Sequence, residues 1–390
     1  MECVSQAEKV HSYVVSIRRT LHEYPELSFQ EFETAKRIEA ELRSMGLSPR
    51  RVAGTGVVAD IEGAQPGRTV AIRADIDGLP VQEENQVEYA SKNKGVMHAC
   101  GHDAHVAMLL GFAKILVEEK RNIRGRVRLI FQPAEEQPPG GAQQLIKEGV
   151  LEGVNYIIGQ HVFSNISAGK VAVYYGPLMA NSDKFIIRLH GRGGHGSAPH
   201  ETVDPIVTAS YYVTLAQTIV SRRVDPVKAA VVTFGTFNAG YRFNIIAAHA
   251  ELTGTVRTLD MDTRGLVKAE LRRLLEGVCN SMGVSYEFEY EEGYPVVVNN
   301  PEVARVVEEA AVDILGRDAV LHPDPVMGGE DFGYYMQRVP GAFYFLGVGN
   351  PAKGVTSPQH TPTYNVDEDA LKHGVAILCR ATERLLSRPS

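Results

Sequence analysis

The sequence predicts an α/β fold in which a mixed central sheet with flanking helices is interrupted by an inserted ferredoxin-like α+β domain. Two observations lead to this prediction. Strand and helix patterns alternate along residues 1–181 and again after residue 293, whereas the segment between them has the order β-α-β-β-α-β. The length of 390 residues agrees with it, because a chain of this size is expected to form about two to three domains.

The elements expected before residue 182 are helices and short β-rich runs. A first helix has apolar residues at three- and four-residue steps from Val10 to Leu21 and ends at Pro25, and a second helix ends at Gly46. The elements that follow are strands 56–61 and 69–74, helix 104–119, strand 126–132, helix 141–148 and strand 156–160. This alternation predicts a parallel or mixed sheet covered by helices.

The middle segment is expected to form an independent unit. Its elements are strand 184–190, helix 205–220, strands 229–237 and 250–257, helix 263–279 and strand 284–290. This order is typical of a ferredoxin-like split βαβ unit. Helix 301–315, strand 342–347 and helix 368–386 then resume the first pattern. We therefore expect a catalytic domain of residues 1–181 and 293–390 and an inserted domain of residues 182–292.

The composition excludes several classes of protein. Hydrophobic residues make up 44% and charged residues 22% of the chain, which argues against intrinsic disorder. The formal net charge of −7 argues against general nucleic-acid binding. With no signal-peptide pattern and no apolar run of about 18 residues, a cytoplasmic protein without a membrane partner is expected. The four dispersed cysteines do not suit a disulfide scaffold, so one of them is free to take part in chemistry.

Residues 98–105 hold the densest group of potential metal ligands. The segment reads His-Ala-Cys-Gly-His-Asp-Ala-His and comes just before an apolar-periodic helix. The thiol of Cys100 and the imidazole of His102, two residues apart, suit a transition metal. Asp103 lies at the expected start of the helix and is predicted to be its N-cap. The structural alternative is a capped helix with surface histidines.

Three further segments place ligand-type side chains at strand ends or in a rigid loop. Glu135 and Glu136 follow an apolar strand, where one carboxylate could bind a metal and the other act as general base. His161 ends the next strand, and His360 lies in a proline-flanked loop. Taken alone, each is equally explained as a solvated or structural group. Together with the Cys-Gly-His segment they supply enough ligands for a two-metal centre with open positions.

The order of these motifs resembles the amidohydrolase branch of the metal-dependent aminoacylase/carboxypeptidase family. Members of that branch include hippurate hydrolases, auxin-conjugate hydrolases and bacterial N-acyl-amino-acid deacylases. The matching motifs are A-C-G-H-D-A-H, Q-P-A-E-E, G-x-H at a strand end, M-G-G-E-D-F and a late His. The resemblance extends to R-R-T-L-H-E-Y-P-E-L-S at 18–28, R-A-D-I-D-G-L-P at 73–80 and H-G-R-G-G-H-G-S-A-P-H at 190–200. It therefore covers almost the whole chain.

The resemblance implies a two-metal hydrolase whose ligands are Cys100, His102, Glu136, His161 and His360. It also implies that Glu135 is the general base and that Cys100 bridges the metals. Two divalent ions per subunit are expected, with Zn or Mn favoured over Co or Ni. More distant relatives have a ligand His two residues before an acidic residue. The matching position here is Arg73, before Asp75, so that His102 replaces the missing ligand and Asp75 either supports the site or is purely structural.

The resemblance also implies roles for the inserted domain, which is expected to act as a lid and to mediate dimerisation. In related enzymes a histidine at the position of His195 reaches the active site of the partner subunit and stabilises the oxyanion. Asn244 and Arg257 are candidate ligands of a substrate carboxylate, a role that suits the forked donors of arginine. A loop His, a turn Asn and a surface Arg are the alternatives. Glu330 is a candidate for orienting a ligand or a loop.

We therefore expect metal-dependent hydrolysis of the amide bond of small-molecule N-acyl-L-amino acids or similar conjugates, with a metal-bound water activated by Glu135. A homodimer or higher homo-oligomer is expected. The nearest alternative is a dipeptidase or carboxypeptidase of the same family. A cysteine hydrolase that uses Cys100 with His102 is more remote, because two residues so close in one loop are poorly placed as a nucleophile and its base.

Overall fold

The computed structural model describes residues 2–388, which divide into two compact units. Unit 1 contains the chain up to Leu178, Val297–Pro325 and the chain from Asp331 onward. Unit 2 contains Met179–Val296 and Val326–Glu330. The borders lie close to the expected ones at residues 181 and 293. The short return to unit 2 before Asp331 has no signal in the sequence.

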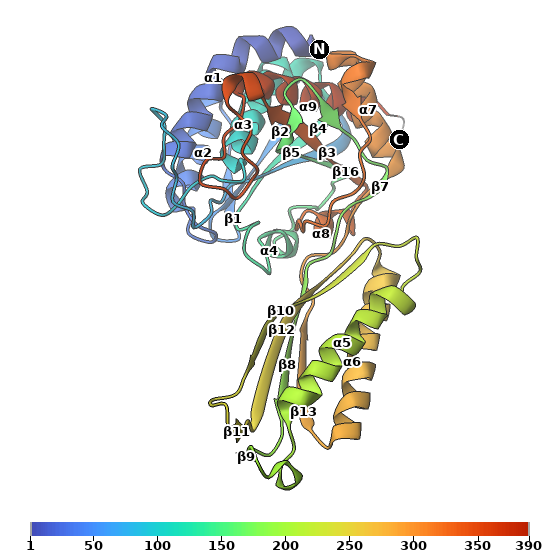
Figure 1. Cartoon of the computed structure of the whole chain (residues 1–390). Helices are drawn as coiled ribbons and strands as arrows, with labels where there is room; N and C mark the ends of the chain where they lie inside the picture. Colours follow the sequence, from blue (N-terminus) through green and yellow to red (C-terminus); the bar gives the residue numbers. More distant parts are fainter. Residues whose placement is uncertain (1, 389–390) are drawn as a thin grey trace. The chain divides into compact units, whose positions relative to one another are not determined.

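Unit 1 is built on an eight-stranded mixed sheet with the strand order β1-β2-β4-β3-β5-β16-β6-β15 (Figure 1). Its strands are β1 Arg50–Val52, β2 Gly56–Glu62, β3 Gln65–Asp75, β4 Arg124–Gln132, β5 Tyr156–Ser167, β6 Val171–Ala172, β15 Val320–Leu321 and β16 Gly341–Gly349. The pairs β4–β3, β3–β5 and β5–β16 are parallel, whereas β1–β2, β2–β4 and β16–β6 are antiparallel. The predicted mixed sheet is confirmed.

Helices flank this sheet. They are α1 Cys3–Glu23, α2 Phe32–Ser44, α3 His102–Glu119, α4 Ala142–Lys147, α7 Pro301–Leu315, α8 Gly333–Met336 and α9 Leu371–Leu386. Helix α3 contacts β3 and packs against α1 and α9. It is buried along most of its length because Leu109, Leu110 and Phe112 lie on several of its faces. Helix α3 is therefore held between the sheet and two helices.

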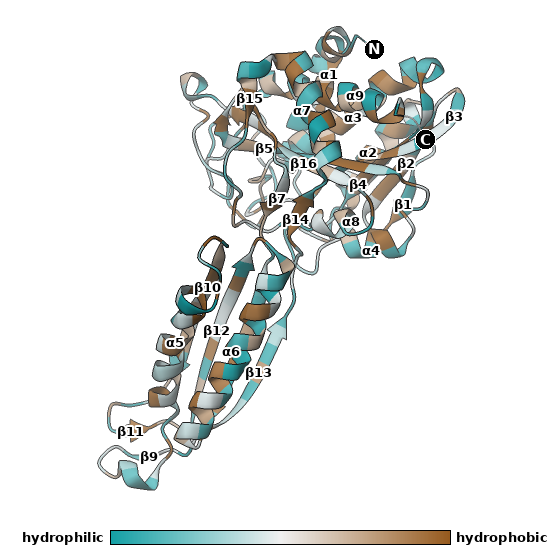
Figure 2. Ribbon diagram, turned by 90° about the vertical axis from the view of Figure 1, so that its right-hand side faces the viewer, coloured by the Kyte–Doolittle hydropathy of each residue, from teal (hydrophilic) through white to brown (hydrophobic). Residues whose placement is uncertain are grey.

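Unit 2 has a four-stranded antiparallel sheet of order β10-β12-β8-β13. Its elements are β8 Asp183–His190, α5 Pro205–Arg222, β10 Ala230–Ala239, β12 His249–Thr258, α6 Met261–Met282 and β13 Ser285–Glu291. Hydrophobic and hydrophilic residues alternate in bands along α6 (Figure 2), and Val267, Leu271 and Leu275 are its buried residues that pack against the sheet. The element order is the ferredoxin-like one that the sequence predicts.

Two short strand pairs complete the fold. Strands β7 Gly176–Met179 and β14 Val297–Asn299 pair with each other, and so do β9 Gly194–His195 and β11 Ile245–Ile246. No helix within residues 2–388 is long and apolar enough to cross a membrane.

Two local predictions are wrong. Asp103 is not the N-cap of α3, because the helix begins at His102 after Gly101 with φ of +92°, and the Asp103 carboxylate instead lies 2.8 Å from both Arg18 and His22. His161 does not end its strand. Strand β5 loses its β3 partner after Gly159 but continues beside β16, so that His161 lies where one edge of the strand has become free.

Candidate metal centre

The segment after β4, the free part of β5, the start of α3 and two loops bring the predicted ligands together in unit 1. The ligand atoms of Cys100, His102 and His161 lie within 4.8 Å of one another. Those of Cys100, Glu136 and His360 do the same. Cys100 belongs to both groups, so its sulfur lies between two sets of ligands. This arrangement has the form of a two-metal centre with a shared thiolate.

The side chains of the cluster lie close to one another. Cys100 Sγ lies 3.4 Å from His161 Nε2. Glu136 Oε1 lies 3.3 Å from His360 Nε2 and 3.8 Å from His102 Nε2. A third group joins His102 and Glu136 to Glu135, whose carboxylate is also within 4.8 Å. All six residues singled out for metal binding and base catalysis are therefore in one place.

Hydrogen bonds fix which nitrogen of each histidine is free. Nδ1 of His161 donates to the carbonyl of Val162 at 2.8 Å, which leaves the lone pair of Nε2 directed at Cys100. Nδ1 of His102 lies 3.2 Å from Asp77, and its Nε2 is buried with no hydrogen-bond partner within residues 2–388. Glu136 Oε1 is likewise buried and unbonded within that range. Two buried polar atoms that face each other without a hydrogen bond are costly unless a cation lies between them, so the residues fit two metal ions.

The electrostatics of the cluster favour cations. Burial lowers the pKa of His102, but Asp75, Asp77 and Glu136 outweigh it and raise this pKa to about 10. Burial, followed by the nearby Glu136 carboxylate, raises the pKa of the Cys100 thiol well above its usual value. A thiolate in this place therefore requires a positive charge beside it, which a divalent ion supplies.

Burial holds His161 neutral by lowering its pKa well below the ordinary value, which suits a metal ligand. A backbone hydrogen bond anchors the loop that carries His360, because His360 N donates to the carbonyl of Ala99, in the loop before α3, at 2.8 Å. His360 has a positive φ of 64°, a conformation that non-glycine residues adopt mainly where the surroundings impose it. Its half-exposed side chain lies on the solvent side of Glu136.

Sequence reasoning missed Asp77, which supports both halves of the cluster. One oxygen of its carboxylate faces His102 Nδ1, and the other accepts from Ser28 Oγ at 2.7 Å and from the backbone N of Glu136 at 3.0 Å. Asp77 thus sets the ring orientation of one predicted ligand and the backbone of another. A signal was available, since Asp77 follows directly after the strand that carries Asp75 within the motif R-A-D-I-D-G-L-P.

Asp75 and Arg73 lie in a buried ion-pair network. Arg73 binds Asp75 at 2.6 Å and Asp331 at 2.9 Å. The other Asp75 oxygen receives Nδ1–H of His105, whose Nε2 accepts from the backbone N of Val162 at 2.9 Å. Both nitrogens of His105 are therefore used, which makes it a support rather than a ligand. The guanidinium of Arg73 has no lone pair with which to bind a metal.

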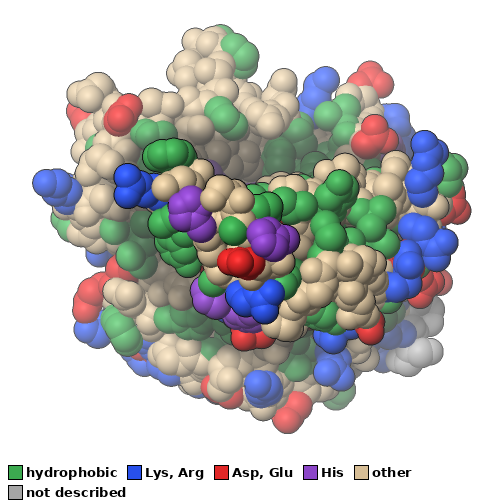
Figure 3. Space-filling model, turned by 60° about the horizontal axis from the view of Figure 1, so that its bottom comes forward, with side chains coloured by type: hydrophobic (Ala, Val, Ile, Leu, Met, Phe, Trp, Pro, Cys, Tyr) green, Lys and Arg blue, Asp and Glu red, His purple; other side chains and the backbone are tan. Residues whose placement is uncertain are grey.

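The candidates in unit 2 lie at two different places. His195 is exposed in β9 and pairs in register with Ile245 of β11, next to Asn244. Histidines gather at this end of the unit (Figure 3), where His190 and His249 are 3.1 Å apart. Arg257 is near the other end of β12, so about 26 Å of strand separates it from His249. Burial lowers the pKa of Arg257, and nearby Asp183 raises it in part.

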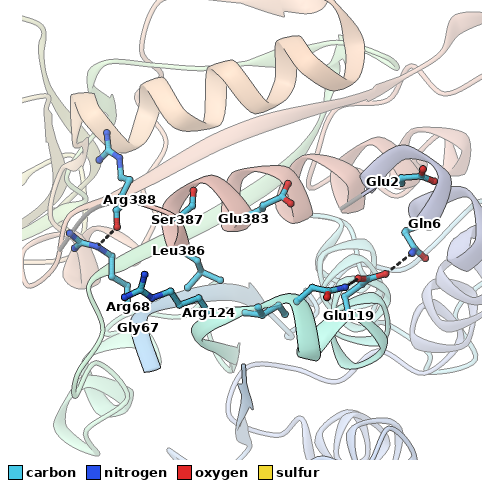
Figure 4. Close-up of a pocket in the computed structure, with 12 residues that line it drawn as sticks. Glu2, Gln6, Gly67, Arg68, Glu119, Arg124, Glu383, Leu386, Ser387 and Arg388 are labelled. Carbon is cyan, nitrogen blue, oxygen red and sulfur yellow. Dashed lines mark hydrogen bonds between the residues drawn. The ribbon is translucent and has the colours of Figure 1, made fainter. Parts of the chain in front are cut away.

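A cavity of about 980 Å³ lies elsewhere in unit 1 (Figure 4). Its lining includes the charged side chains of Arg68, Glu119 and Arg124, together with residues close to both ends of the chain. None of the predicted site residues belongs to its lining.

Comparisons with known proteins agree with the geometry. Residues 71–384 match peptidase family M20/M25/M40. "Thermostable carboxypeptidase 2" of Saccharolobus solfataricus is 45% identical over 374 residues, 95% of this chain and 94% of that protein. "N-acyl-L-amino acid amidohydrolase" of Geobacillus stearothermophilus is 48% identical over 296 residues, 76% of this chain and 80% of that protein. The solved structure of the Bacillus subtilis YXEP protein, described as a dinuclear metal-binding peptidase, has a TM-score of 0.86 at 36% identity and covers 97% of this chain and 99% of that one.

Proposed function

Because the chain belongs to peptidase family M20/M25/M40 and is a metal-dependent amidohydrolase, we propose that it hydrolyses the amide bond of N-acyl-L-amino acids or similar amino-acid conjugates. The observation that carries this proposal is the cluster in which Cys100 is shared by two groups of ligand atoms. The name of the Geobacillus relative supports the substrate class.

The ligands proposed for two divalent ions are Cys100, His102, Glu136, His161 and His360. Such ions, when bound, polarise an amide carbonyl and lower the pKa of water. Zn or Mn is favoured over Co or Ni; the thiolate of the set favours Zn, and its imidazoles and carboxylate also accept Mn, Co and Ni. Asp77 and His105 hold the ligand-bearing segments in place through the hydrogen bonds described above.

Glu135 is the proposed general base. Its side chain is only 6% exposed, and its carboxylate lies within 4.8 Å of the ligand atoms of His102 and Glu136. From there it accepts a proton from the attacking water and returns it to the leaving amine nitrogen. Its burial keeps bulk water away, so that the proton it takes up stays available for the second step.

The separation within unit 2 supports a homodimer or a higher homo-oligomer. His195 is proposed to stabilise the oxyanion, and Asn244 and Arg257 to bind the substrate carboxylate. About 26 Å of strand between the two places is too long for one small substrate to reach both in a single chain. We therefore assign His195 and Asn244 to the active site of the partner subunit.

A surface for such an assembly is present in unit 2, the proposed lid and dimerisation domain. Strand β10 is an edge strand, and its Val231 and Phe237 are exposed. Helix α5 exposes Tyr211 and Leu215. An edge strand with exposed apolar side chains offers both backbone hydrogen bonds and buried area to a second copy.

An aromatic surface beside His161 supports apolar acyl groups as the preferred acyl part. Phe163 is partly exposed and follows His161 by two residues, so both lie on one face of β5. Its ring stacks on buried Phe345 with centroids 4.5 Å apart, and Tyr174 packs edge-on against Phe345. These side chains offer no charged group to a carboxylate. They fit the acyl end of the substrate, which has no charge and needs no charged partner.

A carboxypeptidase or dipeptidase is the second candidate, favoured by the name of the Saccharolobus relative. The two are separated by assaying protein loaded with Zn, Mn or Co against N-acyl amino acids and against dipeptides with a free amine. We expect kcat/KM for N-acyl amino acids to be at least about tenfold higher. Faster cleavage of dipeptides would favour the second candidate. Full activity after removal of metal by a chelator would contradict both. A cytoplasmic location stays a prediction.

A further inference from the structure

The residue before the proposed base has an unusual backbone conformation. Ala134 is fully buried and has a φ of +55°, in the left-handed region. An L-residue with a Cβ is disfavoured there, because the Cβ crowds the following carbonyl oxygen. The conformation of Ala134 sets the direction in which the chain enters Glu135. Contacts with surrounding residues must therefore stabilise this conformation of Ala134.

The group that holds Ala134 is the side chain of Glu31, which comes from the residue just before α2. The backbone N–H of Ala134 donates to Glu31 Oε1 at 2.8 Å. The other oxygen of Glu31 accepts from the hydroxyl of Thr55 at 2.6 Å. Glu31 is fully buried, so neither of these contacts competes with bulk water.

The backbone on the other side of Glu135 is held in the same way by a different carboxylate. The N–H of Glu136 donates to Asp77 at 3.0 Å. The backbone N–H groups of the two residues on either side of the proposed base, Ala134 and Glu136, therefore both donate to buried carboxylates. The two carboxylates differ in one respect. Asp77 also faces the proposed ligand His102, whereas Glu31 accepts hydrogen bonds from Thr55 and Ala134, neither of which is a proposed ligand.

We propose that Glu31 is a positioning residue for the general base: it keeps Ala134 in the left-handed conformation and so directs the Glu135 carboxylate. This rests on the proposed role of Glu135. Without the acceptor, Ala134 relaxes to a negative φ, which turns the next peptide and displaces Glu135. The metal ligands keep their own supports, so metal binding is retained while proton transfer becomes slower.

The test combines changes at both partners of the hydrogen bond. Glu31→Ala removes the acceptor and is expected to lower kcat about tenfold or more, with KM changed less than about twofold and the metal content unchanged. Glu31→Gln keeps an acceptor oxygen at the same place and should stay within about threefold of the wild type. Thr55→Val is the matched control, since it removes the other hydrogen bond of Glu31 and leaves Ala134 untouched.

Ala134→Gly supplies the second half of the cycle, because glycine adopts positive φ without a steric cost. Alone, Ala134→Gly should change kcat by less than about twofold. Combined with Glu31→Ala, it should raise kcat at least about threefold above that of Glu31→Ala alone. Should Glu31→Ala not fold, Glu31→Asp gives the same test, because it keeps the charge but withdraws the acceptor by one methylene.

Three results would overturn the proposal. One is an equal kcat for Glu31→Ala with and without Ala134→Gly. Another is a Glu31→Gln variant as slow as Glu31→Ala. The third is a Glu31→Ala variant that melts earlier but turns over at the wild-type rate. Failure of the underlying function looks different, because Glu135→Gln would then keep its activity with metals bound.

Discussion

The contact between Asp77 and His102 leads to a quantitative prediction about metal affinity. We consider Asp77→Asn, which keeps the size of the side chain and removes its charge and one of its two acceptor oxygens. In the structure the carboxylate serves three donors, namely His102 Nδ1, Ser28 Oγ and the N of Glu136. The remaining amide oxygen can serve only one side, and the new NH2 group faces a donor on the other.

The expected cost follows from the bonds lost. A hydrogen bond to a charged group contributes about 1.5–3 kcal/mol, and part of this is recovered because the amide oxygen keeps one donor. A net loss of about 2 kcal/mol corresponds to a roughly 30-fold weaker binding of the ion held by His102, since 1.4 kcal/mol is tenfold. This lies in the range found when the partner of a metal-ligating histidine is removed, about 10- to 100-fold.

The assay is a competition titration of Zn against a chelating dye, with the two binding steps fitted separately. Ser28→Ala is the control, because it removes one hydrogen bond of Asp77 and leaves the face toward His102 intact. It should weaken binding by less than about threefold. The activity of Asp77→Asn should recover at high metal concentration. An Asp77→Asn protein that binds both ions as tightly as the wild type would show that Asp77 does not support His102.

Three further predictions concern substrate, stability and assembly. Phe163→Ala removes an apolar contact worth about 1.4 kcal/mol, so kcat/KM should fall about tenfold for substrates with long-chain or benzoyl acyl groups. For acetyl substrates the fall should be less than twofold. An equal loss of kcat/KM for all of these acyl groups would contradict the prediction. Burial raises the pKa of Glu31 to about 7, above its unfolded value of about 4.5, so the wild type loses stability as pH rises through this window. The free energy of unfolding of Glu31→Gln, measured by thermal melting, should therefore rise by about 1–3 kcal/mol relative to that of the wild type between pH 4.5 and pH 7. A difference in stability that does not change with pH would contradict this prediction. Phe237→Glu in the edge strand β10 should yield monomers in light scattering, while Val227→Glu, at an 89% exposed position, should not; unchanged oligomers of Phe237→Glu would exclude this surface.

The sequence predicted the fold and the cluster largely because both depend on local signals. Apolar periodicity placed the strands and helices, and ligand-type residues at strand ends marked the places where a parallel sheet gathers side chains. Cys100, Glu136, His161 and His360 come from four separate segments of the chain, and the structure brings their ligand atoms together. Their chemical type, rather than any contact, was what made them visible in the sequence.

The supports of the cluster depend on contacts between distant segments and could not be predicted in the same way. Asp103 has the position of a helix cap in the sequence, yet it binds Arg18, a residue 85 positions away. In the sequence, Glu31 looks like an ordinary residue at the start of a helix. Only the structure shows that its side chain accepts a hydrogen bond from the backbone N–H of Ala134. A carboxylate that bonds to a buried backbone leaves no periodic pattern, because its partner is set by tertiary packing.

The division of the unit 2 candidates also required the structure. His195, Asn244 and Arg257 all carry suitable chemistry, and a linear sequence gives no distance between them. The pairing of β9 with β11 places His195 beside Asn244, whereas the length of β12 moves Arg257 away from both. Strand register therefore decides which of these residues can meet one substrate.

The most direct measurement is anomalous X-ray diffraction from crystals of the protein reconstituted with Zn or Mn, recorded at the absorption edge of the metal. We expect two ions per chain, both bonded to the sulfur of Cys100, with His102, Glu136, His161 and His360 completing their ligand sets. A single ion, or two ions that do not share Cys100, would contradict it.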